Sequence, residues 1–169
     1  MKPKILLIED DAQIRDLISC MLEMEGHSVV AAENGIEGVA RHREELPDLI
    51  ITDMVMPEQG GAETIHQIRR AAPDARIIAI SGGGSLDGTH LLTVAKRLGV
   101  IETLQKPFSA DELIACINRL LRHLPLGIFS NRRRVAPRLK SHFFSPLEMS
   151  LRAVSAQSRA QRHVSRNAG

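Results

Sequence analysis

The chain has 169 residues, of which 43% are hydrophobic and 25% are charged. This size and composition are typical of a soluble protein with one folded domain and an extension. No apolar run reaches the length of a membrane span, and the residues before the first acids are too few for a signal-peptide core. We therefore expect a cytoplasmic protein without membrane contact. The two cysteines have no metal-type spacing and are interpreted as reduced thiols.

Charge is divided unevenly along the chain. Residues 1–123 carry 13 Lys and Arg against 19 Asp and Glu, a net charge of −6. Residues 124–169 carry nine basic residues against one acid, a net charge of +8. Such a break typically separates a folded unit from a tail. The sequence therefore predicts a folded domain over residues 1–123 and a basic, disordered extension over residues 124–169.

Short apolar runs alternate with helical patterns along the first domain. The runs are mostly β-branched and apolar at consecutive positions, which is typical of strands buried on both faces of a parallel sheet. They lie at residues 5–8, 28–32, 48–52, 76–80 and 100–104. The first helix is predicted by an apolar stripe, Ile14, Leu17, Ile18, Met21 and Leu22, and Gly26 ends it. Weaker helical patterns occupy residues 35–45, 60–71 and 86–98, and a capping box opens the last helix at Ser109.

Five strands alternating with five helices predict an α/β fold. The expected form is a (βα)5 doubly wound parallel sheet with right-handed crossovers and helices on both faces. In such folds, ligands bind outside the carboxyl ends of the strands. The residues that directly follow each strand are therefore the candidates for function.

Polar residues follow four of the five expected strands. These residues are Glu9, Asp10, Asp53, Ser81 and Lys106. Taken singly, each has an ordinary structural interpretation, because an acid after a strand is commonly a helix cap or a turn residue. Taken together, three carboxylates, a hydroxyl and an ammonium are expected at one edge of the sheet.

This combination of groups favours phosphoryl-transfer chemistry. Three carboxylates a few ångströms apart repel one another, and a hard divalent cation would relieve the repulsion. Mg²⁺ prefers oxygen ligands and retains waters, so two or three carboxylates and a backbone carbonyl are enough to hold it. A carboxylate could then attack a phosphoryl group and form an acyl phosphate, while lysine and hydroxyl groups stabilise the transferred charge.

In order and spacing, these residues resemble the receiver domain of bacterial two-component response regulators. The resemblance covers about residues 2–122 and rests on the acid pair after the first strand, "DMVMP" after the third, the hydroxyl of the fourth and "KPF" after the fifth. It implies a flavodoxin-like sheet of order 2-1-3-4-5. It also implies a phosphoacceptor switch, not an enzyme, that takes its phosphoryl group from a histidine kinase or a phosphotransfer protein.

The resemblance further implies roles for individual residues. Asp53 would be the phosphoacceptor. Glu9, Asp10 and Asp53 would hold Mg²⁺ together with the backbone carbonyl of Val55. The acid pair and Asp53 stand in the order and spacing of the family.

The remaining implied roles concern the phosphoryl group and the switch. Ser81 and Lys106 would contact the phosphoryl oxygens, and the Lys106–Pro107 peptide bond would be cis. Receivers usually carry an aromatic residue three positions before the lysine, but Thr103 stands there in this chain. We therefore expect switching at Ser81 and Thr103 to depend mainly on movement of residues 81–85.

The basic extension leaves a second interpretation open. Residues 145–148, "SPLE", could start one amphipathic helix, but the segment is too poor in apolar residues for an output domain of its own. The main hypothesis is a stand-alone receiver that signals through contacts with an unknown protein partner, with nucleic-acid binding unlikely. The alternative is a DNA-binding transcriptional regulator that uses the basic C-terminal tail.

Overall fold

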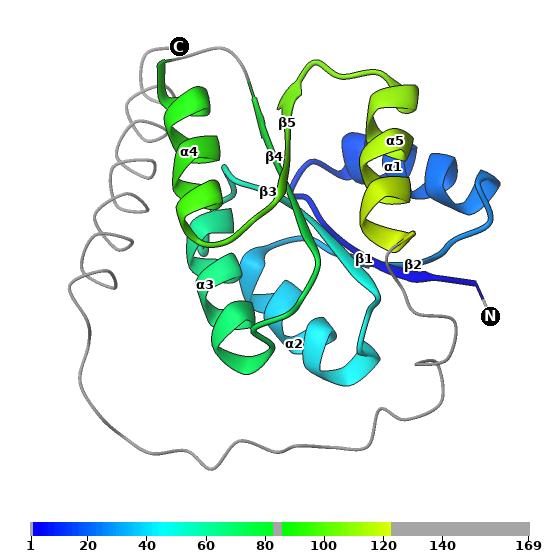
Figure 1. Cartoon of the computed structure of the whole chain (residues 1–169), viewed down its shortest axis with the longest axis horizontal. Helices are drawn as coiled ribbons and strands as arrows, with labels where there is room; N and C mark the ends of the chain where they lie inside the picture. The colour runs from blue at the N-terminus through cyan, green and yellow to red at the C-terminus, as the bar shows by residue number, and fades with distance from the viewer. Residues whose placement is uncertain (1, 83–85, 123–169) are drawn as a thin grey trace.

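The computed structural model describes residues 2–82 and 86–122, in which five strands alternate with five helices (Figure 1). The elements in chain order are β1 Lys4–Ile8, α1 Ala12–Met24, β2 Ser28–Ala32, α2 Gly35–Glu45, β3 Leu49–Asp53, α3 Gly61–Ala71, β4 Ile77–Gly82, α4 Leu86–Arg97, β5 Glu102–Lys106 and α5 Ala110–Leu121. The predicted extension over residues 124–169 and its possible helix lie outside the described residues.

The strands form one parallel sheet in the order β2-β1-β3-β4-β5, which confirms the predicted α/β topology. Helices α1 and α5 cover one face of the sheet, and α2, α3 and α4 cover the other (Figure 1). None of the helices that the structure describes could cross a lipid bilayer.

Strand β1 supplies side chains to the cores on both faces of the sheet. Ile5 and Leu7 pack with α1 and α5, whereas Leu6 and Ile8 pack with the helices of the opposite face. All four side chains are almost completely buried. The consecutive apolar run thus has the physical cause that the sequence predicted, because a strand covered on both faces needs apolar side chains at every position.

The fifth strand begins two residues later than the sequence predicts. Helix α4 ends in a turn in which Gly99 has φ +83° and the Val100 amide donates to the carbonyl of Ala95 at 3.1 Å. This is a Schellman-type helix end, in which the apolar residue after the glycine packs back on the helix. Val100 is buried for that reason, and the next residue, Ile101, has 76% of its surface exposed.

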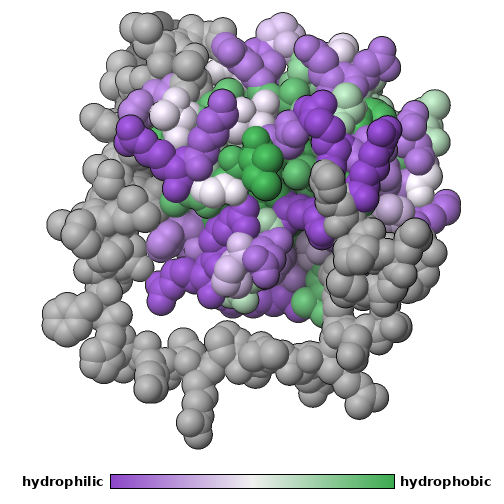
Figure 2. Space-filling view, viewed as in Figure 1, coloured by the Kyte–Doolittle hydropathy of each residue, from purple (hydrophilic) through white to green (hydrophobic). Residues whose placement is uncertain are grey.

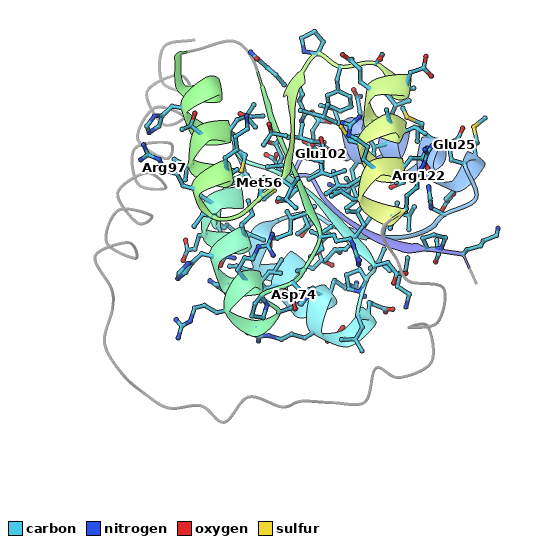
Figure 3. The ribbon with its side chains drawn as sticks, viewed as in Figure 1. Glu25, Met56, Asp74, Arg97, Glu102 and Arg122 are labelled. Atoms are coloured by element: carbon cyan, nitrogen blue, oxygen red, sulfur yellow. The ribbon has the colours of Figure 1, made fainter. Side chains whose placement is uncertain are left out.

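Strand β5, at the edge of the sheet, is joined to helix α5 by an ion pair. Glu102, labelled in Figure 3, accepts hydrogen bonds from Arg119 of α5 at 2.7 and 2.9 Å and so ties β5 to that helix. Figure 2 shows apolar residues gathered near the middle of the face of the molecule that is viewed in Figure 1, with hydrophilic residues around them.

Candidate functional site

The sheet topology brings the predicted site residues to one edge. Glu9 directly follows β1, Asp53 is the last residue of β3, and Lys106 is the last residue of β5. Ser81 lies near the end of β4, where the register places it opposite Gln105. Because β1, β3, β4 and β5 are consecutive neighbours in the sheet, their carboxyl ends converge.

The three predicted metal-binding acids form a cluster. One carboxylate oxygen from each of Glu9, Asp10 and Asp53 lies within 4.8 Å of the others. Glu9 and Asp53 are buried, with 2% and 6% of their surfaces exposed, and Asp10 is half-buried. Three hard oxygen donors at this spacing, one of them open to solvent, suit a small divalent cation that keeps some of its waters.

Lys106 joins two of these acids. Its Nζ donates to Glu9 Oε2 at 2.7 Å and to Asp53 Oδ2 at 2.6 Å. Burial lowers the pKa of Lys106, but the charges of Asp53 and Glu9 and their hydrogen bonds outweigh burial, and the pKa lies above its usual value. The ammonium therefore stays charged between the two carboxylates at neutral pH.

Burial has the largest effect on the pKa of Glu9. Its burial raises the pKa of the carboxyl group, and repulsion from Asp53 and Asp10 adds to this effect. The hydrogen bond and charge of Lys106 offset only part of the rise. Without a metal ion, the acid cluster therefore holds more negative charge than one lysine balances.

The loop after β3 folds back on Asp53. The Val55 amide donates to Asp53 Oδ1 at 2.9 Å, which fixes the carboxylate relative to the loop. A Cβ on Gly61 would lie 2.3 Å from the Asp53 carbonyl oxygen, so α3 can start at this position only with a glycine. Between them, Glu58 adopts a left-handed conformation with φ +62°. The role of the Val55 carbonyl as a metal ligand stays a prediction.

The Ser81 side chain lies at the carboxyl end of β4, as expected for a group that contacts a phosphoryl oxygen. The Ser81 side chain is fully buried, and its Oγ has no hydrogen-bond partner among the described residues. Such an orphaned hydroxyl is uncommon, and it suits a position where an incoming group completes the hydrogen bond.

The Lys106–Pro107 peptide bond is cis, as the resemblance implied. Thr103 is half-buried on β5, opposite Ala79, and its switch role stays a prediction.

Comparisons with known proteins agree with this geometry. The family model described as "Response regulator receiver domain" matches residues 5–118. The chain belongs to this receiver family. The receiver domain is 35% identical over 122 residues to the chemotaxis protein CheY of Bacillus subtilis, which covers 72% of this chain and 99% of the relative. It is accordingly a phosphoacceptor of two-component signalling.

Longer regulators and a solved structure are similar over the same region. The CpxR homologue of Haemophilus influenzae, named a transcriptional regulatory protein, is 34% identical over 119 residues, which are 70% of this chain and 50% of that relative. The crystal structure of a receiver domain protein from Clostridium thermocellum matches with a TM-score of 0.65 and 34% identity, covering 71% of this chain and 94% of that one. DNA binding by the present chain stays a prediction, and the basic segment on which it depends lies outside the described residues.

The sequence reasoning missed one contact of the receiver site. Arg15 of α1 donates from Nη1 to the carbonyl oxygens of Glu9 at 2.8 Å and Asp10 at 3.3 Å. Its position one turn into a helix is typical of a solvent-exposed arginine, so the sequence carries no direct signal of this role. Only the angle at which α1 leaves β1 brings the guanidinium back to the acid pair.

Proposed function

We propose that Asp53 of this receiver domain accepts a phosphoryl group from the phosphohistidine of a histidine kinase or a phosphotransfer protein. The reaction is Mg²⁺-dependent and cytoplasmic, and the domain promotes only its own phosphorylation and dephosphorylation. One observation carries the proposal. The Asp53 carboxylate lies in the acid cluster with one oxygen hydrogen-bonded to Lys106 Nζ at 2.6 Å.

The chemistry follows from this placement. An oxygen of Asp53 attacks phosphorus in line with the bond to the donor imidazole. The new O–P bond forms as the P–N bond breaks, and the imidazole leaves with the electron pair. Lys106 Nζ is already in contact with Asp53, so it is placed to bind an oxygen of the phosphoryl group. The buried Ser81 Oγ supplies a second hydrogen bond.

The donor set of the acid cluster supports Mg²⁺ as the cofactor. Glu9, Asp10 and Asp53 offer carboxylate oxygens, and the Val55 carbonyl is proposed as a fourth ligand. When bound, Mg²⁺ would neutralise charge on the phosphoryl oxygens, which otherwise repel a carboxylate nucleophile. The raised pKa of Glu9 agrees with a site that is short of positive charge in the metal-free protein.

Labelling of an Asp53→Asn variant tests the proposal. The full chain is incubated with Mg²⁺ and radiolabelled acetyl phosphate or a phosphohistidine donor. Wild type should acquire acid-stable, base-labile label, and Asp53→Asn should acquire none. Asp74→Asn is the matched control, because Asp74 is exposed and precedes β4 at the amino-terminal edge of the sheet (Figure 3). Label of this kind on Asp53→Asn would contradict the assignment.

The switch is proposed to depend on Ser81 and Thr103. Thr103 is too small to act as an aromatic lever, so movement of residues 81–85 toward the phosphoryl group should carry the change to a protein partner. Hydrogen exchange with and without beryllofluoride, a phosphoryl mimic, should change most over residues 81–92. A largest change over residues 100–104, with the segment after β4 unaffected, would contradict this mechanism.

A further inference from the structure

Arg15 connects the first helix to the main chain of the acid pair. It lies in the first turns of α1, and its Nη1 donates to the Glu9 carbonyl at 2.8 Å and, less closely, to the Asp10 carbonyl at 3.3 Å. The helix start itself is fixed by Asp11, whose Oδ1 accepts from the amides of Gln13 and Ile14 at 2.9 and 3.1 Å. Arg15 therefore clamps the turn between β1 and α1 from the helix side.

With this contact, Glu9 is held at three separate points. Its amide donates to the Ala32 carbonyl at 3.1 Å, its carbonyl accepts from Arg15, and its carboxylate accepts from Lys106 at 2.7 Å. The Asp10 carbonyl accepts the second bond from Arg15. The guanidinium thus bridges the main chain of the two acids whose side chains enter the cluster.

The charge of Arg15 is unfavourable for a metal site. A guanidinium close to a cluster that binds a cation repels that cation, and Lys106 already supplies a positive charge to the cluster. For binding of the cation, electrostatics therefore gives no reason for an arginine at this position. The directional hydrogen bonds of the planar guanidinium give one, because they fix the carbonyls to which the two acids are attached.

We propose that Arg15 is a positioning residue, which orders the turn formed by residues 9–11 and so aligns the Glu9 and Asp10 carboxylates for Mg²⁺. This inference rests on the metal site of the proposed function and adds a residue that does not touch the ion. Groups that orient metal ligands from outside the coordination shell commonly change metal affinity by factors of about 10 to 100 when they are removed.

The two possible effects of Arg15 on Mg²⁺ have opposite signs, so a substitution separates them. If Arg15 acted only as a charge, Arg15→Gln would bind Mg²⁺ more tightly, because the variant no longer repels the divalent cation. If Arg15 aligns the acids, Arg15→Gln should bind Mg²⁺ on the order of 10-fold more weakly. The sign of the change decides the question.

The experiment is calorimetric titration of Mg²⁺ into the full-length chain, as wild type, Arg15→Gln, Arg15→Lys and Gln13→Ala. Gln13 is the matched control, because it is exposed and lies in the same helical turn. Both Arg15 variants should lose affinity, with urea midpoints in metal-free buffer close to that of wild type, and Gln13→Ala should not. Arg15→Lys, which keeps the charge, gives the comparison if Arg15→Gln does not fold.

Amide exchange in the metal-free protein provides a readout that does not depend on the ion. The amides of residues 10–12 should exchange faster in Arg15→Gln than in wild type, with the central strands unchanged. Unchanged or tighter Mg²⁺ binding in the Arg15 variants would overturn the proposal, as would an equal loss in Gln13→Ala. Wild type that does not bind Mg²⁺ would instead refute the proposed metal site, and the exchange experiment would still test Arg15.

Discussion

Replacing Lys106 should make the metal-free receiver domain depend on Mg²⁺ for its stability. In Lys106→Met, the buried carboxylates of Glu9 and Asp53 lose their shared ammonium, and their oxygens lie within 4.8 Å of each other. Two like charges at this distance repel by about 3.5 kcal/mol at an effective dielectric constant of 20. Removing one partner from a buried ion pair typically costs about 3–5 kcal/mol. We therefore expect a loss of about 3 kcal/mol in the free energy of unfolding.

Added Mg²⁺ should restore most of this loss. A bound cation relieves the same repulsion, so the variant gains more from the metal than wild type does, and linkage requires that it also binds Mg²⁺ more tightly. The assay is urea unfolding of both proteins with EDTA and with saturating Mg²⁺. It is run at pH 8, where proton uptake by the unpaired carboxylates relieves the repulsion least.

A second lysine provides the control for this measurement. Lys4 pairs with Glu45 at 2.9 Å near the other end of the sheet, where both side chains are about one-third exposed. Lys4→Met should change stability little, and its response to Mg²⁺ should equal that of wild type. The reasoning is refuted if metal-free Lys106→Met loses less than about 1 kcal/mol, or if Mg²⁺ stabilises wild type and Lys106→Met equally.

Three further predictions follow from single features. Burial raises the pKa of Glu9, so the stability that this carboxyl group contributes to the metal-free protein is fully present below its unfolded pKa and is lost as pH rises through its folded pKa. The difference in unfolding free energy between wild type and Glu9→Gln, measured by urea unfolding, should follow this profile. A difference that does not change with pH would show that burial does not perturb Glu9. Glu58 has φ +62°, so Glu58→Gly should raise the free energy of unfolding by about 1 kcal/mol, and a decrease would show that the side chain compensates for the strain. The Val55 side chain cannot orient an attacking water, so the phosphorylated domain should lose its phosphoryl group slowly in Mg²⁺ buffer. Val55→Asn should accelerate this loss. Decay of the wild-type phosphoprotein within seconds, or an equal decay rate in Val55→Asn, would contradict the prediction.

The fold and the location of the site could be predicted because both depend on simple repetition. Apolar runs such as residues 5–8 and 48–52 specify buried parallel strands, and a parallel sheet gathers their carboxyl ends. Glu9, Asp53 and Lys106 therefore had to meet, whatever the details of the connecting helices. Strand boundaries were less certain where an apolar residue has another use, as Val100 does in the turn that ends α4.

The contacts between elements could not be predicted in this way. The reach of Arg15 back to Glu9 depends on the exit angle of α1 and on one side-chain conformation, and neither leaves a periodic signal. The same holds for the approach of α2 to β1, where a Cβ on Gly38 would lie 2.4 Å from Ile8 Cδ1. The orphaned hydroxyl of Ser81 was visible only once its neighbours were placed.

Strand β1 has one further consequence, which concerns how accurately the chain folds. Because Ile5 to Ile8 are apolar and buried on both faces, a shift of the strand by one residue would still bury apolar side chains, and hydrophobicity alone does not set its register. The polar ends set it. Lys4 pairs with Glu45 outside the core, and a shift that placed Glu9 at the position of Ile8 would move its buried carboxylate away from Lys106 and against Gly38. An apolar substitution of Glu9 would therefore extend the run to five residues and remove one of the two polar ends that define the register of the strand.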